Sequence, residues 1–207
     1  MQSFQEQETT RLRHFHYVTA LLLLAVMLLA GCKKPEPPTS SIKLKGSLDS
    51  SFTLYDPAGK QVSLTDFRGK AVLLFFGFVQ CPDVCPTALT RAAHVKQLLG
   101  ADADRLQVIF VSVDPERDTP EILREYTAAF GKDFLGLTAD AQTIRKTADA
   151  FGIYYTKVPT GSSYTMDHTT ISYLYAPDGK IYAAITADSP AEEVARDVRN
   201  VLADGTS

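Results

Sequence analysis

Residues 71–79 form the segment that most restricts what this chain can fold into. The segment is almost continuously apolar and contains Val72, Leu73, Leu74, Phe75, Phe76 and Phe78. A strand that is apolar on both faces has to be covered on both sides, as the central strands of α/β proteins are. A second buried strand is expected at residues 106–113, with a helix at residues 86–99 between the two. This order favours an α/β protein whose site lies at a strand-to-helix turn.

The rest of the chain continues the alternation of strands and helices. We expect an N-terminal β-hairpin, two further helices that each precede a glycine, a second hairpin and a closing helix. In chain order these are residues 52–55 with 62–64, 120–130, 141–151, 169–175 with 180–186, and 190–202. The expected fold class is α/β, with a central mixed sheet flanked by helices and an N-terminal β-hairpin.

Composition restricts the possible partners. The 207 residues are 45% hydrophobic and include 21 basic and 24 acidic side chains, which gives a net charge of −3. This length and composition suit one globular domain with a sizeable core. Nucleic-acid binders carry an excess of basic residues to neutralise phosphates, so we expect no nucleic-acid partner.

The N-terminal segment, residues 1–31, is typical of an export signal. A basic flank that includes Arg11 and Arg13 precedes an unbroken apolar run at residues 18–30. That run is shorter than the ~20 apolar residues of a membrane-spanning helix. Its end, Leu29-Ala30-Gly31-Cys32, looks like the lipobox of bacterial lipoproteins, in which the cysteine carries the lipid. The alternative is a short uncleaved anchor, and either interpretation places the rest of the chain outside the cytoplasm.

Residues 32–43 are expected to form a tether. This stretch has no apolar periodicity, and its prolines at positions 35, 37 and 38 favour an extended chain. Residues 44–207 then form the folded domain. We expect a domain on the periplasmic side of a bacterial membrane, held there by the lipid on Cys32.

Cys81 and Cys85 are the residues most suited to chemistry. They lie between the first buried strand and the helix expected to begin near Pro86. A helix N-terminus favours the thiolate, the form that binds metals and attacks disulfides. Spacing of four residues brings both sulfurs to one side, which suits a single metal ion or a disulfide. A purely structural disulfide is the simplest alternative in an oxidising compartment, although so short a loop gains little stability from one.

A third ligand would separate a metal site from a redox site. His94 lies nine residues beyond Cys85 on the same expected helix, roughly 13 Å away at ~1.5 Å per residue, and is expected on its surface. His168 is expected at the start of the strand at residues 169–175, where it can face the cysteines if the two strands are neighbours. Alone, such a histidine is usually structural. Two thiolates with one imidazole favour copper, particularly Cu(I), whereas zinc usually takes a fourth ligand.

Three motifs in this chain resemble the Sco/SenC family, over a region from about Leu44 to the C-terminus. They are Phe78-Val79-Gln80-Cys81-Pro82-Asp83-Val84-Cys85-Pro86, then Val111-Ser112-Val113-Asp114-Pro115-Glu116-Arg117-Asp118-Thr119-Pro120, and Asp167-His168-Thr169-Thr170, which continues into Tyr173-Leu174 and Pro177-Asp178-Gly179. Members of this family are thioredoxin-fold copper proteins that assist assembly of the dinuclear copper centre of cytochrome c oxidase. The resemblance implies the same fold and task for this chain.

The resemblance also implies a ligand set. Cys81, Cys85 and His168 would bind copper, as Cu(I), Cu(II) or both, with Asp114 and Asp167 close to the site. Asp114 has an alternative role, which is to start the turn before Pro115. The implied partners are the copper-bearing subunit of cytochrome c oxidase and, further, another copper chaperone.

The rival interpretation is a periplasmic thiol–disulfide oxidoreductase that uses the same cysteine pair, because one fold supports several functions. Thioredoxin-like reductases carry Cys-x-x-Cys and a facing proline. This chain has one more residue between its cysteines, and His168 stands where that proline is expected. A metallochaperone is therefore favoured over an enzyme. A copper or redox sensor is a third class, and it would need a signalling partner.

Overall fold

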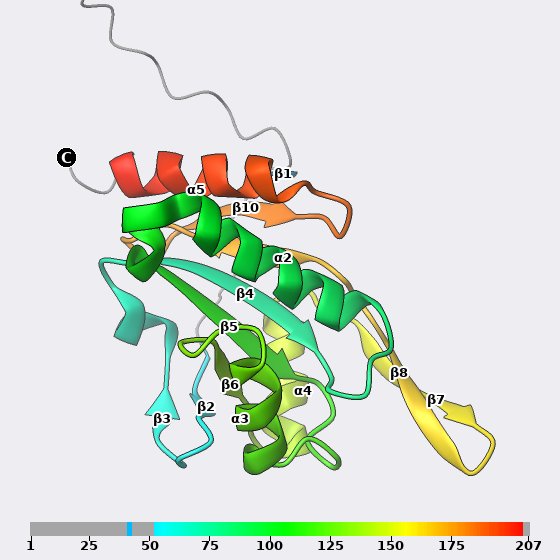
Figure 1. Ribbon diagram of the computed structural model, residues 1–207. Coiled ribbons are helices and arrows are strands. Elements are labelled where there is room, and N and C mark those ends of the chain that lie inside the picture. The colour runs from blue at the N-terminus through cyan, green and yellow to red at the C-terminus, as the bar shows by residue number, and fades with distance from the viewer. Residues whose placement is uncertain (1–40, 43–51, 205–207) are drawn as a thin grey trace, which may run out of the picture. The chain divides into compact units, whose positions relative to one another are not determined.

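The computed structural model describes residues 41–42 and 52–204, which build a main sheet with helices packed on it and two separate two-stranded pairs (Figure 1). The sheet has six strands in the order β1-β10-β9-β4-β5-β6. Strands β4, β5 and β6 are parallel, and β9 runs antiparallel to both β4 and β10. The expected α/β class with a central mixed sheet is therefore confirmed.

The longest strands of this sheet are β4 and β5, with seven residues each. Their bounds are β1 Ser41–Ile42, β4 Ala71–Gly77, β5 Leu106–Ser112, β6 Leu135–Leu137, β9 Ser172–Tyr175 and β10 Ile181–Ile185. Strands β2 (Leu54–Tyr55) and β3 (Gln61–Val62) form the expected N-terminal hairpin as a separate antiparallel pair. Strand β1 lies within the expected tether and pairs with β10, so β1 is an edge strand of the sheet.

Strand β4 is the centre of the core, because all seven of its residues are buried. It pairs with β5 over its whole length and with β9 on its other side. A strand with neighbours on both edges and helices over the sheet requires apolar side chains on both faces, which is the pattern of its sequence. The strand ends at Gly77, two residues earlier than expected, and the chain then turns toward the cysteines.

Four α-helices lie among the described residues, with two 3-10 helices. Their bounds are α2 Val84–Leu99, α3 Pro120–Ala128, α4 Ala141–Ala150, α5 Ala191–Asp204, η1 Leu64–Phe67 and η2 Gly100–Arg105. Helices α2 and α5 pack side by side, and α3 packs on β6 (Figure 1). Among the described residues, no helix has the length and apolar character that a membrane crossing requires.

Local features explain where α3 and α4 begin and where α2 ends. Asp140 accepts hydrogen bonds from the backbone N–H groups of Gln142 and Thr143 at 3.0 Å, which caps α4. Thr119 caps α3 in the same way, and Pro120 occupies its first turn, where proline has no backbone hydrogen bond to lose. Helix α2 ends at Gly100, whose φ of 59° lies in the left-handed region that glycine tolerates.

A second, unexpected hairpin carries the candidate histidine. Strands β7 (Tyr155–Thr160) and β8 (Ser163–His168) pair with each other and with neither edge of the main sheet. The hairpin extends away from the sheet in Figure 1. His168 therefore ends β8, and the expectation that it starts the strand at residues 169–175 was wrong. The two-residue turn Gly161-Ser162 joins the two strands and is a hairpin signal in the sequence.

The segments assigned to export and lipidation lie outside the described residues. These are residues 1–31, Cys32 and all of the tether except Ser41 and Ile42.

The hairpin that was expected at residues 169–175 and 180–186 is present as β9 and β10, which pair in antiparallel register around the turn at residues 176–179.

Candidate metal centre

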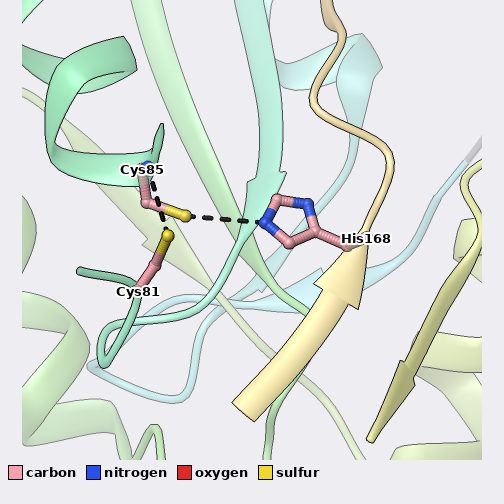
Figure 2. Close-up of side chains that lie close together, drawn as sticks. All are labelled: Cys81, Cys85 and His168. Carbon is pink, nitrogen blue, oxygen red and sulfur yellow. Dashed lines mark hydrogen bonds between the residues drawn. The ribbon is translucent and has the colours of Figure 1, made fainter. Parts of the chain in front are cut away.

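Three side chains from three separate segments meet at the end of β4. Cys81 lies in the loop after this strand, Cys85 in the first turn of α2, and His168 at the end of β8 (Figure 2). Their ligand atoms all lie within 4.8 Å of one another, and Nε2 of His168 is 3.7 Å from Sγ of Cys85. Both cysteines are free thiols. The structure therefore brings together the three residues that were predicted to bind copper.

The first turn of α2 explains why the two sulfurs share one side. The helix begins at Val84, two residues earlier than expected, so Cys85 is helical and Pro86 lies in the first turn. The first backbone N–H groups of a helix need an acceptor from outside it, and the side chain of Asp83 makes no cap hydrogen bond. Sγ of Cys81 takes this role and accepts from the backbone N–H of Cys85 at 3.4 Å (Figure 2).

Burial controls the ionisation of Cys85. Its side chain is 0% exposed, and this burial raises the pKa of the thiol far above its ordinary value. The nearby Cys81 and Asp118 raise it further, whereas the backbone N–H of Phe78 partly offsets them. The expectation that the helix N-terminus holds Cys85 as a thiolate is therefore wrong for the metal-free protein, because desolvation outweighs the helix dipole. A bound cation would reverse this balance and displace the thiol proton.

His168 is held with its Nε2 toward the sulfurs. Its Nδ1 lies 2.9 Å from the carbonyl oxygen of Thr169. Because a carbonyl can only accept, Nδ1 carries the proton and Nε2 keeps a free lone pair. Phe75 and Phe78 pack edge-on around the ring, with centroids at 6.1 and 5.8 Å. Burial lowers the pKa of His168, although the Thr169 contact and Asp167 act in the opposite direction. The imidazole is thus favoured in its neutral, ligating form.

The donor set fits a soft metal ion. Ligand atoms bound at ~2.0–2.3 Å from one metal lie roughly 3.5–4.5 Å apart, so small side-chain movements would complete the site. Two sulfurs and one nitrogen match the preference of copper, and the described residues contain no fourth histidine, cysteine or carboxylate in this group. Cys85 is buried, whereas Cys81 and His168 are partly exposed. The site is therefore open on the side of these two ligands.

Other candidates lie outside the ligand cluster. His94 is exposed on α2, as expected. Asp167 is also exposed, and it acts on the site through its effect on the pKa of its neighbour His168. Asp114 is 1% exposed and pairs with Arg117. Its backbone oxygen also accepts from the N–H groups of Arg117 and Asp118, so it starts a turn.

Asp118 is a buried residue near the site that the sequence analysis did not assign. Its carboxylate accepts from the backbone N–H of Val79 at 3.1 Å and from the hydroxyl of Ser112 at 2.6 Å. Together the two bonds tie the loop that leads to Cys81 to Ser112 at the end of β5. Burial raises the pKa of this carboxyl. Asp118 is part of the second sequence motif, but only the fold shows that it contacts the loop that leads to Cys81.

The raised pKa predicts an effect of pH on stability. In the unfolded chain Asp118 ionises near ~3.9, whereas the folded protein keeps its proton to a higher pH. The folded state then binds more protons in this window, so this carboxyl lowers the free energy of unfolding as pH rises through it. Asp118→Asn should remove that slope in urea unfolding at pH 4–8. Asp118→Ala should cost about 2–3 kcal/mol, because it leaves two donors without their acceptor.

Asp140→Asn is the matched control for this titration. Hydrogen bonds from Thr143 lower the pKa of Asp140, so its contribution is present above ~3.9 and is lost as pH falls. Asparagine retains the cap oxygen but not the charge. The two asparagine variants should therefore change the pH profile in opposite directions. Identical profiles for wild type and Asp118→Asn would contradict the burial argument.

Comparison with known proteins extends these observations. The SCO1/SenC family profile matches residues 41–203. An SCO2-like protein of Rickettsia felis is 31% identical over 181 residues, which cover 82% of this chain and 86% of that protein. Bradyrhizobium japonicum ScoI, solved with copper bound, is 41% identical with a TM-score of 0.67, over 72% of this chain and 96% of that one. BsSco, described as a member of the Sco family of cytochrome c oxidase assembly proteins with a disulfide switch, is 26% identical with a TM-score of 0.59, over 78% and 99%.

Proposed function

The chain belongs to the SCO1/SenC family, and from this premise we propose that it is a metallochaperone that binds copper through Cys81, Cys85 and His168. The fold is thioredoxin-like, as in the related Sco structures. The single observation that carries the proposal is the convergence of two sulfurs and one imidazole nitrogen within 4.8 Å. The copper-bound relative from Bradyrhizobium japonicum supports the choice of metal.

The exposure of the ligands suits transfer of the metal. Copper would be cargo here, held by one buried anchor, Cys85, and by two ligands that a partner can approach. Transfer by ligand exchange needs an incoming ligand to replace one of the bound ones, and the partly exposed Cys81 and His168 allow this. Cytochrome c oxidase is the proposed acceptor, because BsSco is described as an assembly protein of that enzyme. The acceptor site would be its dinuclear copper centre.

Thiol–disulfide exchange is the second candidate function. The two free sulfurs are close enough to join after a small movement, and Cys81 is accessible to a substrate. The lone pair of His168 Nε2 faces Cys85, an arrangement that suits metal binding better than disulfide exchange. Rapid reduction of a model disulfide without copper, with a potential near the ~−270 mV of thioredoxin, would favour the oxidoreductase.

We also propose that the domain at residues 44–207 is lipid-anchored through Cys32 on the periplasmic side of a bacterial membrane. The support is the apolar run at residues 18–30 and the Leu-Ala-Gly-Cys sequence that ends it. This location would place the metal site in the compartment where the copper centre of a membrane oxidase is assembled.

The delivery function is tested in cells that express the full-length chain in place of the native gene. Cys81→Ser and Cys85→Ser should each lower the copper content and activity of cytochrome c oxidase, because each removes a thiolate ligand. His94→Ala should leave both unchanged, since this histidine is exposed and outside the site. Cys32→Ser should move the protein out of the membrane fraction. Normal oxidase copper in both cysteine variants would rule out delivery through this site.

A further inference from the structure

Two structural units carry the three candidate ligands, and no backbone hydrogen bonds of the main sheet join them. Cys81 and Cys85 belong to the turn between β4 and α2, whereas His168 belongs to the β7–β8 hairpin. This hairpin pairs with no other strand among the described residues. An isolated two-stranded hairpin has marginal stability, so side-chain contacts have to fix its position. The distance from His168 to the sulfurs therefore depends on what anchors the hairpin.

Arg117 joins the two units. Its Nη1 donates to the side-chain oxygen of Gln80 at 3.0 Å and to the backbone oxygen of Tyr164 at 2.7 Å. Gln80 immediately precedes Cys81, and Tyr164 lies on β8, the strand that ends at His168. One guanidinium nitrogen thus bridges the turn that carries the cysteines and the strand that carries the histidine.

Two further contacts hold Arg117, one at its Nε and one at the face of its guanidinium. Its Nε forms an ion pair with the buried carboxylate of Asp114. Asp114 also accepts from the hydroxyl of Tyr164 at 2.9 Å. The guanidinium lies over the Tyr164 ring, with Cζ 3.8 Å from the ring centroid. A buried ion pair, a stacked ring and shared hydrogen bonds leave this guanidinium one geometry, which is a role that arginine suits and lysine does not.

We propose that Arg117 is a positioning residue for the metal site, which it serves by tying the His168 hairpin to the cysteine turn. Asp114 orients Arg117, and Gln80 and Tyr164 are the two points that it connects. This inference rests on the proposed copper function and assigns to the arginine a role that the ligand set alone does not reveal. Without the bridge, the hairpin loses this polar link to the turn, and His168, whose ring still packs against Phe75 and Phe78, is held less firmly beside the sulfurs.

The two oxidation states of copper make the role measurable. Cu(I) is soft and is satisfied by two thiolates, whereas Cu(II) depends more strongly on the imidazole nitrogen. Loss of a residue that only positions His168 should therefore weaken Cu(II) binding far more than Cu(I) binding. General damage to the cysteine turn would weaken both. The ratio of Cu(II) affinity to Cu(I) affinity therefore distinguishes the loss of His168 positioning from general damage to the fold.

The test compares Arg117→Ala with Lys157→Gln in the full-length protein. Lys157 pairs with Glu116 and so links the same hairpin to the same loop after β5, but this exposed ion pair does not reach the cysteine turn. Arg117→Ala should lower Cu(II) affinity about 10–100-fold, the usual cost of losing a residue that orients a metal ligand, and should leave Cu(I) affinity near wild type. The nitrogen coupling in the Cu(II) electron paramagnetic resonance spectrum should weaken. Lys157→Gln should bind both ions as wild type does, and Arg117→Lys should not restore Cu(II) affinity.

A double-mutant cycle gives the decisive result. If Arg117 acts through His168, Arg117→Ala should cause no further loss of Cu(II) affinity when His168→Ala is already present. Additive losses, equal losses of Cu(I) and Cu(II), or wild-type Cu(II) affinity in Arg117→Ala would each overturn the proposal.

A metal-free readout separates this proposal from the copper function itself. Amide hydrogen exchange at residues 164–168 should be faster in Arg117→Ala than in wild type or Lys157→Gln, because the bridge no longer holds β8. If the wild-type protein binds no copper, the proposed function fails. The rate of amide hydrogen exchange at residues 164–168 then decides by itself whether Arg117 anchors the hairpin. Unchanged exchange in Arg117→Ala would show that it does not.

Discussion

Cys85→Ser is expected to abolish tight Cu(I) binding, with a loss greater than the ~100-fold upper range for residues that only support a ligand. Cys85 is the fully buried member of the site, and its thiolate is a soft donor that a serine hydroxyl does not replace. Cys81→Ser should have a similar effect. His168→Ala should weaken Cu(I) binding much less, because both thiolates remain. Anaerobic competition with a chromophoric Cu(I) chelator measures these differences.

Two controls separate coordination from folding in this experiment. Cys85→Ala removes the sulfur without burying a new hydroxyl, so it should lose copper as Cys85→Ser does while preserving stability better. His94→Ala removes a histidine from the exposed side of α2 and should bind copper normally. Cu(I) affinity near wild type in folded Cys85→Ser would show that Cys85 is not a ligand.

Gly77→Ala is expected to damage the fold and the metal site together. A Cβ at this position would lie 2.7 Å from Sγ of Cys85, 2.8 Å from the ring of Phe110 and 2.9 Å from the ring of Phe75. These contacts are too close, so the sulfur and both rings would have to move. Overpacking of this kind costs about 1–3 kcal/mol. For a domain of this size the melting temperature should fall by roughly 2–12 °C, and Cu(I) affinity should fall because Cys85 is displaced.

Gly136→Ala is the matched control in the same sheet. Its Cβ would meet Leu123 and Thr127 at 3.2–3.3 Å, which is tight but less severe, and it would touch no metal ligand. This variant should lose less stability and keep its copper affinity. Thermal unfolding and the chelator titration measure both properties. A Gly77→Ala protein with wild-type stability and copper affinity would contradict the packing at the end of β4.

The predictable part of the fold consists of segments with strong periodic or apolar patterns. The buried strands β4 and β5, the helix α2 and the N-terminal hairpin were all expected near their observed positions. The hairpin at β7 and β8 was missed, because Pro159 and the polar residues around it hide the alternation. Proline is tolerated there because β7 is an edge strand and its missing N–H costs no sheet hydrogen bond.

The candidate site was predictable as a set of residue types but not as an arrangement. Cys81, Cys85 and His168 were selected because their chemistry and spacing suit a soft metal, and the fold places their ligand atoms together. The raised pKa of Cys85 was not foreseen, since helix position alone favours the thiolate and only burial reverses that preference. Arg117 and Asp118 were visible in a motif, although nothing in the sequence indicated which segments they contact.

The sequence by itself therefore determined the fold class, the candidate ligands Cys81, Cys85 and His168, and the family. Such properties follow from local patterns, since residues of one strand, one turn or one motif are close along the chain. The tertiary structure alone decided that Cys85 is buried, that His168 ends a separate hairpin and that Arg117 bridges this hairpin to Gln80. The position of His168 beside Cys85 and the Arg117 bridge depend on contacts between residues that are more than 30 positions apart, and only packing of the whole domain brings them together.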